Sequence, residues 1–173
     1  MKTVPLHGKV AAGRVALVDD DDYDLVMAYR WFVVEKSRSG VGRRRDDGPY
    51  AKTTVRHPDG HWTTARMHSL LTGWPQTDHK DHDGLNNQRS NLRPATQSQN
   101  AANQRPMEGR TSQYKGVSWK REYRKWLAKI TIRKRGRHLG YFAVEEDAAR
   151  AYDAAALAAW GEFACLNFPL SAR

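Results

Sequence analysis

The sequence contains one cysteine, Cys165, among its 173 residues. A single cysteine makes no internal disulfide and supplies no CxxC zinc site, which excludes a disulfide-stabilised secreted scaffold and a zinc ribbon. Long apolar runs are also lacking: none approaches the roughly 18 residues of a membrane helix, and the opening MKTVPLHGKV has no signal-peptide core. We therefore expect an intracellular, cytoplasmic protein with no membrane partner.

Acidic residues are scarce in one part of a strongly basic chain. The formal net charge is +10, yet residues 107–143 hold 11 of the 29 Lys and Arg residues and only 2 of the 19 Asp and Glu residues. Such a local excess predicts a surface for nucleic acid, and the alternative is a solvated basic face without a partner. With 39% hydrophobic and 28% charged residues, the chain has the balance of one ordinary globular domain or two small ones.

The first 66 residues alternate short apolar runs with turn residues. Asp19 or Asp20 is placed to cap a short helix, and we interpret the acidic run 19–22 as structural, because four consecutive carboxylates cannot all point at one metal ion. Residues 31–35 and 50–55 read as two strands of a hairpin. The loop between them contains Arg43, Arg44 and Arg45, which are either solvated or in contact with phosphates. A turn at 57–60, a further strand and a short helix around 67–71 follow.

Residues with catalytic potential gather between positions 77 and 100. A histidine such as His79 is the natural base at neutral pH. Asp78 and Asn100 offer hard oxygen ligands, which suit Mg²⁺ or Mn²⁺. Because neighbours on a strand point to opposite faces, Asp78 and His79 serve one phosphate only where the strand ends or twists. Zinc held by His79 and His82 is the competing metal site.

The segment 67–104 resembles the HNH homing endonucleases, of the ββα-metal type with asparagine as the third letter. The residues that carry the resemblance are His68, Asp78-His79, Asn86-Asn87, Asn91-Leu92-Arg93 and Asn100. The resemblance implies His79 as the general base, Asp78 and Asn100 as ligands of one divalent ion, Asn91 as the residue that orients the His79 ring, and His68 as scaffold. The family varies at 82–84, so His82 is either a second ring near the substrate or a loop histidine.

After a linker at 105–113, the pattern predicts strands at 114–119, 125–133 and 137–142 and a helix at 145–160. In the middle strand Trp126, Ala128, Ile130 and Ile132 alternate with a basic face. The helix has a stripe of small residues that favours close packing on the sheet.

Residues 113–169 look like the plant-type ethylene-response-factor domain, an APETALA-like DNA-binding domain. The resemblance rests on Tyr114 to Val117, His138 to Phe142, Glu145 to Tyr152 and Leu166 to Phe168. It implies a three-stranded antiparallel sheet in the major groove with a helix behind it. The residues implied to face DNA are Lys115, Ser118, Lys120, Lys125, Lys129, Thr131 and His138. Where the plant domains often carry arginine and tryptophan, this chain has Ser118, Thr131 and His138, and we expect Arg121, Arg133, Arg135 and Arg137 to substitute, since arginine recognises guanine by paired hydrogen bonds.

These observations predict an α+β protein: a small-strand region with an HNH motif (1–104), a linker (105–113) and a sheet domain packed on one helix (114–169). The function that they favour is a metal-dependent, site-specific DNA endonuclease of the kind carried by phages and mobile elements. We expect a monomer that binds double-stranded DNA and no small-molecule cofactor. The alternative is a transcription regulator with an inactive HNH segment, whereas an RNA-binding protein would need a preference for single strands.

Overall fold

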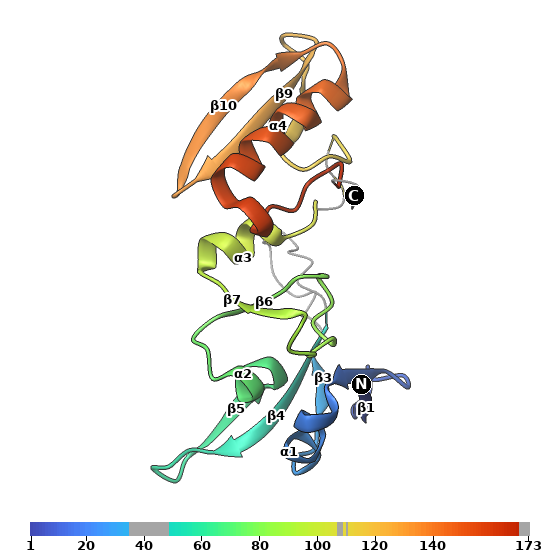
Figure 1. The fold of residues 1–173 in the computed structure, drawn as a ribbon. Coiled ribbons are helices and arrows are strands. Elements are labelled where there is room, and N and C mark those ends of the chain that lie inside the picture. Colours follow the sequence, from blue (N-terminus) through green and yellow to red (C-terminus); the bar gives the residue numbers. More distant parts are fainter. Residues whose placement is uncertain (35–48, 107–108, 110, 170–173) are drawn as a thin grey trace. The chain divides into compact units, whose positions relative to one another are not determined.

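The computed structural model describes residues 1–34, 49–106, 109 and 111–169 (Figure 1). These residues divide into an N-terminal unit (1–34 and 49–96) and a C-terminal unit that starts at Gln97. The basic loop predicted around Arg43 to Arg45 lies outside the described residues. No helix in the part of the chain that the structure describes has the length and apolar character needed to cross a membrane.

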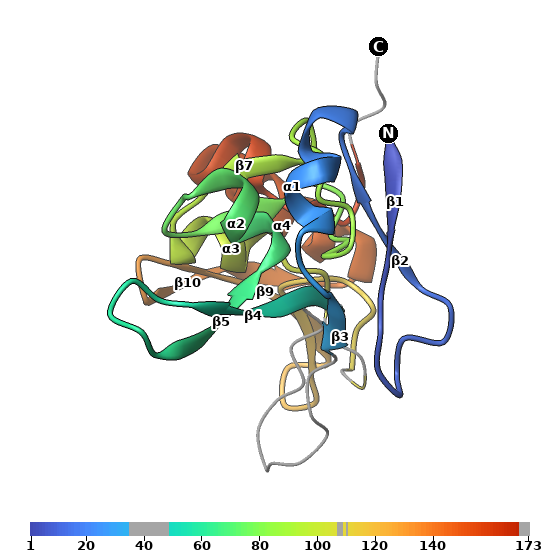
Figure 2. The same cartoon turned by 90° about the horizontal axis from the view of Figure 1, so that it is seen from below.

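The N-terminal unit is built from antiparallel strand pairs and short helices. β1 pairs with β2 (Figure 2), β3, β4 and β5 form a three-stranded sheet in that order, and β6 pairs with β7. The elements are β1 (Lys2–Pro5), β2 (Val15–Val18), η1 (Asp20–Asp22), α1 (Tyr23–Met27), β3 (Phe32–Val34), β4 (Tyr50–Arg56), β5 (Trp62–Arg66), α2 (Met67–Thr72), β6 (Thr77–His79) and β7 (Leu92–Pro94).

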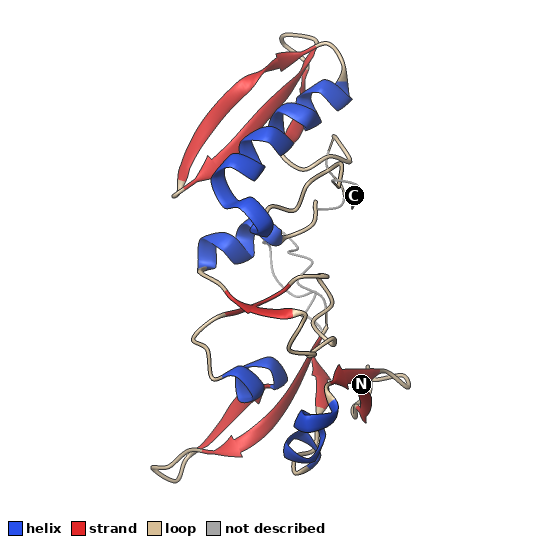
Figure 3. Ribbon diagram, viewed as in Figure 1, coloured by secondary structure: helices blue, strands red, loops and turns tan. Residues whose placement is uncertain are grey.

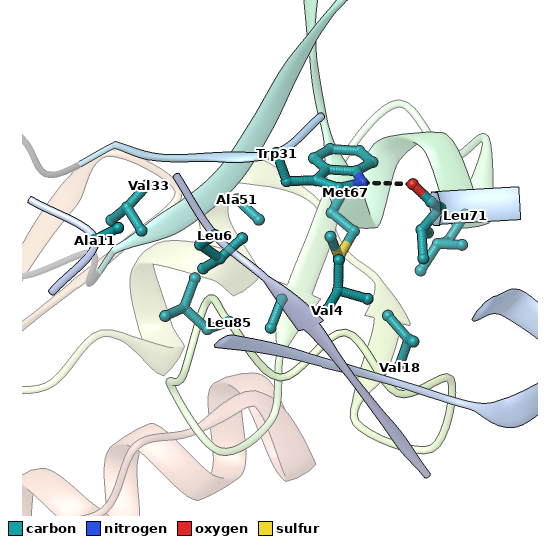
Figure 4. Close-up of a cluster of buried hydrophobic side chains, with 12 residues drawn as sticks. Val4, Leu6, Ala11, Val18, Trp31, Val33, Ala51, Met67, Leu71 and Leu85 are labelled. Atoms are coloured by element: carbon teal, nitrogen blue, oxygen red, sulfur yellow. Dashed lines mark hydrogen bonds between the residues drawn. The ribbon is translucent and has the colours of Figure 1, made fainter. Parts of the chain in front are cut away.

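The core of this unit gathers apolar side chains from most of these elements. Trp31, with 1% of its surface exposed, donates from Nε1 to the carbonyl oxygen of Val26 at 2.7 Å (Figure 4). Val4, Val18 and Met67 are equally enclosed. The core therefore joins the β1–β2 pair to the larger sheet and to α2.

The acidic run 19–22 makes structural contacts, but the predicted helix cap is not formed, because Asp19 occupies the N-cap position of η1 without a side-chain capping hydrogen bond. Asp19 precedes η1, and its carboxylate accepts from the backbone N–H of Arg89 at 2.8 Å. Asp22 is buried and takes two hydrogen bonds from the Arg89 guanidinium, at 2.9 and 2.7 Å. The run thus ties the N-terminal segment to the 80–91 loop.

The C-terminal unit consists of one sheet, a long helix and a short one. Its elements are α3 (Gln97–Asn103), β8 (Val117–Lys120), β9 (Lys125–Ile132), β10 (Arg135–Phe142), α4 (Glu145–Trp160) and η2 (Gly161–Phe163). The sheet is antiparallel in the order β10-β9-β8, and α4 packs on one of its faces (Figure 3). The predicted antiparallel sheet and the helix at 145–160 are confirmed, and so is an α+β fold.

α3 is held within this second unit. The amide of Cys165 donates to the carbonyl oxygen of Ala102, the residue before the end of α3. The sequence predicted a boundary after residue 104 instead. This hydrogen bond joins residues 63 positions apart, and such a contact has no signature in local composition.

Candidate nucleic-acid interface

One face of the β8–β9–β10 sheet is covered by α4. Trp126, Ala128, Ile130 and Ile132 of β9 pack in the clusters that include the helix residues Ala148, Ala149 and Tyr152. The period of two in β9 then sends the alternate residues to the opposite side. We call that opposite side the open face.

The strand register defines the members of the open face, because residues directly opposite each other on antiparallel strands share a face. Lys125 pairs with Lys120, Lys129 with His138, and Leu127 with both Ser118 and Tyr141. Lys120, Lys125, Lys129, Thr131 and His138 are exposed and Ser118 is half-buried. Six of the side chains predicted to face DNA therefore share one surface of the sheet.

The register places the arginines of β10 elsewhere. Arg137 pairs with Ile130 and Arg135 with Ile132, so both occupy positions on the helix-covered side of the sheet. Arg121 and Arg133 lie in the segments that join the strands, and Arg133 has a φ of 49°. Apart from Lys115, the predicted set therefore splits into an open-face group, two residues in the connecting segments and two on the other side.

A β-bulge adds aromatic rings to the open face. The register shifts between His138 and Gly140, and Gly140 has a φ of 142° at this bulge. As a result His138 and Tyr141, three positions apart, point the same way. The Tyr141 ring lies 4.7 Å from that of His138 and 4.8 Å from that of Tyr123, between ring centres. The sequence pattern predicted neither tyrosine: a simple alternation puts residues 138 and 141 on opposite faces, and Tyr123 lies between the predicted strands.

Lys115 is used inside the C-terminal unit. Its ammonium donates to the carbonyl oxygens of Ala102 and Gln104 near the end of α3. Burial lowers the pKa of this group. A lysine that caps a helix C-terminus is favourably placed there, and its charge is less available to a phosphate.

Asp78, predicted as a metal ligand, lies in β6 opposite Arg93 of β7. Its Oδ2 atom accepts from Arg93 Nε at 2.8 Å and lies 2.7 Å from Arg93 Nη2. The guanidinium already compensates the carboxylate and competes with a cation for the same oxygen. Asn100, the other predicted ligand, belongs to the other unit. The Mg²⁺ or Mn²⁺ site stays a prediction.

His79 is enclosed rather than open to water, with 6% of its surface exposed. Burial lowers the pKa of its ring, against the opposing hydrogen bond to Asn87 and the charge of Asp81. The Nε2 atom lies 3.5 Å from Oδ1 of Asn87. The structure thus gives Asn87 the contact that the sequence predicted for Asn91.

The Asn91 amide serves the loop instead. Its Nδ2 donates to Asp81 Oδ1 at 2.9 Å and to the Asn86 carbonyl at 2.8 Å, which uses both of its hydrogens. Of the two neighbouring histidines, His68 is buried and His82 is half-buried. His68 contacts the His79 ring edge-on, with 4.9 Å between centres. His82 has a buried Nε2 without a hydrogen-bond partner among the described residues, so its ring is not an exposed loop group.

Comparisons with known proteins find relatives for part of the chain. It is 44% identical over 68 residues to the AP2-like ethylene-responsive transcription factor CRL5 of Oryza sativa subsp. japonica, which covers 35% of this chain and 11% of the relative. It is 42% identical over 72 residues to AIL7, another such factor, of Arabidopsis thaliana, covering 36% and 14%. It is 47% identical over 58 residues to the ethylene-responsive transcription factor ERF015 of the same plant, covering 32% and 30%.

The chain thus spans less than a third of the length of each of these relatives. No family model matches it, the 67–104 segment included, and no solved structure matches it. The prediction of an enzyme is therefore corrected, because the relatives are named as transcription factors and none is named as a nuclease. What the comparisons support is the other resemblance: part of this chain is similar to AP2-like ethylene-responsive transcription factors.

Proposed function

We propose that the protein is a DNA-binding transcription regulator that places the open face of its β8–β9–β10 sheet in the major groove of double-stranded DNA. The observation that carries this proposal is the separation of the two faces of β9. One face packs on α4, and the other presents Lys125 and Lys129 in register with Lys120 and His138.

The dimensions of the sheet support this mode of binding. Adjacent strands lie about 4.8 Å apart, so three strands span about 10 Å between their outer axes. The major groove of B-DNA is about 12 Å wide and admits a two-stranded β-ribbon, and three strands are only slightly narrower than the groove. The connections at both ends of β9 carry Arg121 and Arg133, where they are placed to contact the phosphates that border the groove.

We assign the side chains of the open face to two roles: some position the protein on the duplex, and others recognise the bases. Lys120, Lys125 and Lys129 contact phosphates, which fixes the protein on the duplex without selecting a sequence. His138, Thr131 and Tyr141 offer hydrogen-bonding groups and apolar surface for base edges. Lys115 is not among the proposed DNA contacts, because its ammonium binds carbonyl groups of the C-terminal unit. Arg135 and Arg137 are not among them either, because the strand register puts both on the helix-covered side of the sheet. No chemical step is assigned to the N-terminal unit.

The test is a salt titration of binding to one duplex. Each phosphate contact contributes about −0.9 to the slope of log affinity against log salt, so Lys125→Ala/Lys129→Ala should flatten the slope by about two units. The matched control is Arg135→Ala/Arg137→Ala, which removes the same charge from the other side of the same sheet. Its slope should stay close to that of the wild type.

Equal slopes for the two double variants would show that net charge, rather than the open face, governs binding, and would overturn the proposal. Tighter binding to a single-stranded RNA than to the duplex would assign the face to another nucleic acid. Regulation itself is tested by a reporter gene placed beside the preferred site, which should respond to the wild type and not to the Lys125/Lys129 variant.

A further inference from the structure

A tight turn joins β4 to β5 (Figure 1), and it carries three potential metal ligands, His57, Asp59 and His61. Arg56 and Trp62 form the last strand pair, and the five intervening residues read His-Pro-Asp-Gly-His. The backbone closes the turn with hydrogen bonds from His57 N to the His61 carbonyl and from Gly60 N to the His57 carbonyl, both 2.8 Å. Gly60 takes a φ of 94°, which a residue with a side chain rarely adopts.

The side chains of this turn converge on one point. The rings of His57 and His61 stack with 4.6 Å between centres and an angle of 21°. Nδ1 of His57 lies 3.0 Å from Oδ1 of Asp59, and Nδ1 of His61 lies 2.5 Å from the same oxygen. All three ligand atoms lie within 4.8 Å of one another. Within the described residues, no other group of three histidine, cysteine or acidic side chains does this.

We propose that the β4–β5 turn binds a divalent transition-metal ion of the zinc class through His57 Nδ1, Asp59 Oδ1 and His61 Nδ1. Two imidazole nitrogens with one carboxylate oxygen suit zinc and its neighbours, whereas magnesium and calcium prefer oxygen alone. A tetrahedral ion with bonds of about 2.0–2.1 Å separates its ligand atoms by about 3.3 Å. The two distances from Asp59 Oδ1 to the imidazole nitrogens, 3.0 and 2.5 Å, therefore need to grow by less than about 1 Å to admit the ion.

The surroundings favour reversible binding. The side chains of His57, Asp59 and His61 are 50%, 56% and 60% exposed, so an ion reaches them without any opening of the fold. Three protein ligands leave a fourth position for water or for a donor from another molecule. The Asp59 carboxylate also accepts from the backbone N–H of His61, which holds its Oδ1 atom near the Nδ1 atoms of both rings. This site is separate from the open face, so it does not depend on the proposed function.

The experiment is a zinc titration of the full-length protein against a chromophoric chelator, with NMR signals of residues 57–61 as the local readout. The wild type should bind one equivalent of zinc with shifts confined to the turn. His57→Ala, His61→Ala and Asp59→Asn should each weaken binding by at least about tenfold. His7→Ala removes a histidine elsewhere in the N-terminal unit and should leave this binding unchanged.

Three outcomes would overturn the proposal. One is the absence of saturable binding up to about 100 μM zinc, because a site with a weaker affinity than this would not be a specific zinc site. Another is binding that persists in the His61→Ala variant, which would place the ion elsewhere. The third is an equal response to magnesium. Since the three side chains are exposed, the variants should fold, and unchanged amide spectra outside the turn check this.

Discussion

The pair formed by Asp78 and Arg93 predicts a large and specific loss of stability. The two residues face each other across β6 and β7, and their side chains are only 7% and 10% exposed. Two guanidinium nitrogens lie 2.7 and 2.8 Å from one carboxylate oxygen. Arg93→Met keeps the volume and the apolar stem but leaves a buried carboxylate without this partner. Removing one member of a buried ion pair costs about 3–5 kcal/mol.

The double variant separates the charge from the packing. Asp78→Asn/Arg93→Met has no buried charge at either position, and such replacements often cost little. We expect it to recover at least half of the loss seen in Arg93→Met. A folded unit has about 5–15 kcal/mol of stability, so the single change removes a large share. The assay is urea unfolding of the full chain, with hydrogen exchange of the β6 and β7 amides to assign the transition to the N-terminal unit.

A loss below about 1 kcal/mol in Arg93→Met would refute this reasoning, because the carboxylate would then have another compensating charge. The same experiment with added Mg²⁺ carries a second check. If Arg93 compensates Asp78, magnesium should leave the unfolding midpoint of the wild type unchanged. If magnesium raises the unfolding midpoint of the wild type but not that of Asp78→Asn, the Asp78 carboxylate is a metal ligand after all.

Two further predictions concern one residue in each unit. Gly116 has a φ of 78°, and an added Cβ would lie 1.9 Å from the Tyr152 ring. Gly116→Ala should therefore lower the free energy of unfolding of the C-terminal unit by about 3 kcal/mol. Gly161→Ala, which has open space around it, is the control and should lower it by about 1 kcal/mol. Burial lowers the pKa of His68 to about 3. The unfolded chain then binds more protons than the native one as pH falls below about 6.5, so stability should drop by roughly 1.4 kcal/mol per pH unit from there, and His68→Phe should flatten this dependence in urea unfolding at stepped pH.

Elements with a strong, uninterrupted period could be predicted from the sequence. The alternation in Lys125–Ile132 and the small-residue stripe in Glu145–Trp160 correspond to the observed strand and helix. In β10 the period is broken by the bulge at Gly140, so the shared face of His138 and Tyr141 was not visible in the pattern. A bulge depends on how two strands pair, and this information is not contained in either strand alone.

The roles of individual polar residues were harder to predict, because they depend on contacts that are distant in sequence or fixed by loop geometry. Asn86, Asn87 and Asn91 are chemically identical, and only the fold of the 80–91 loop decides that Asn87 reaches the His79 ring. Lys115 was predicted to contact DNA, yet its ammonium donates hydrogen bonds to carbonyl groups more than ten positions earlier in the chain.

A motif identifies residue types, whereas function depends on what those residues are free to contact. In the N-terminal unit, the carboxylate of Asp78 is paired with Arg93 and the His79 ring is buried. The residues that suggested a hydrolytic site are therefore also part of the interior of this unit. The basic face of the sheet differs in this respect. Lys125 and Lys129 are exposed on a regular strand whose other side is occupied by packing, which leaves their charge for a partner outside the molecule. Because exposed lysines contribute to binding mainly through their charge, the salt dependence of binding tests this surface directly.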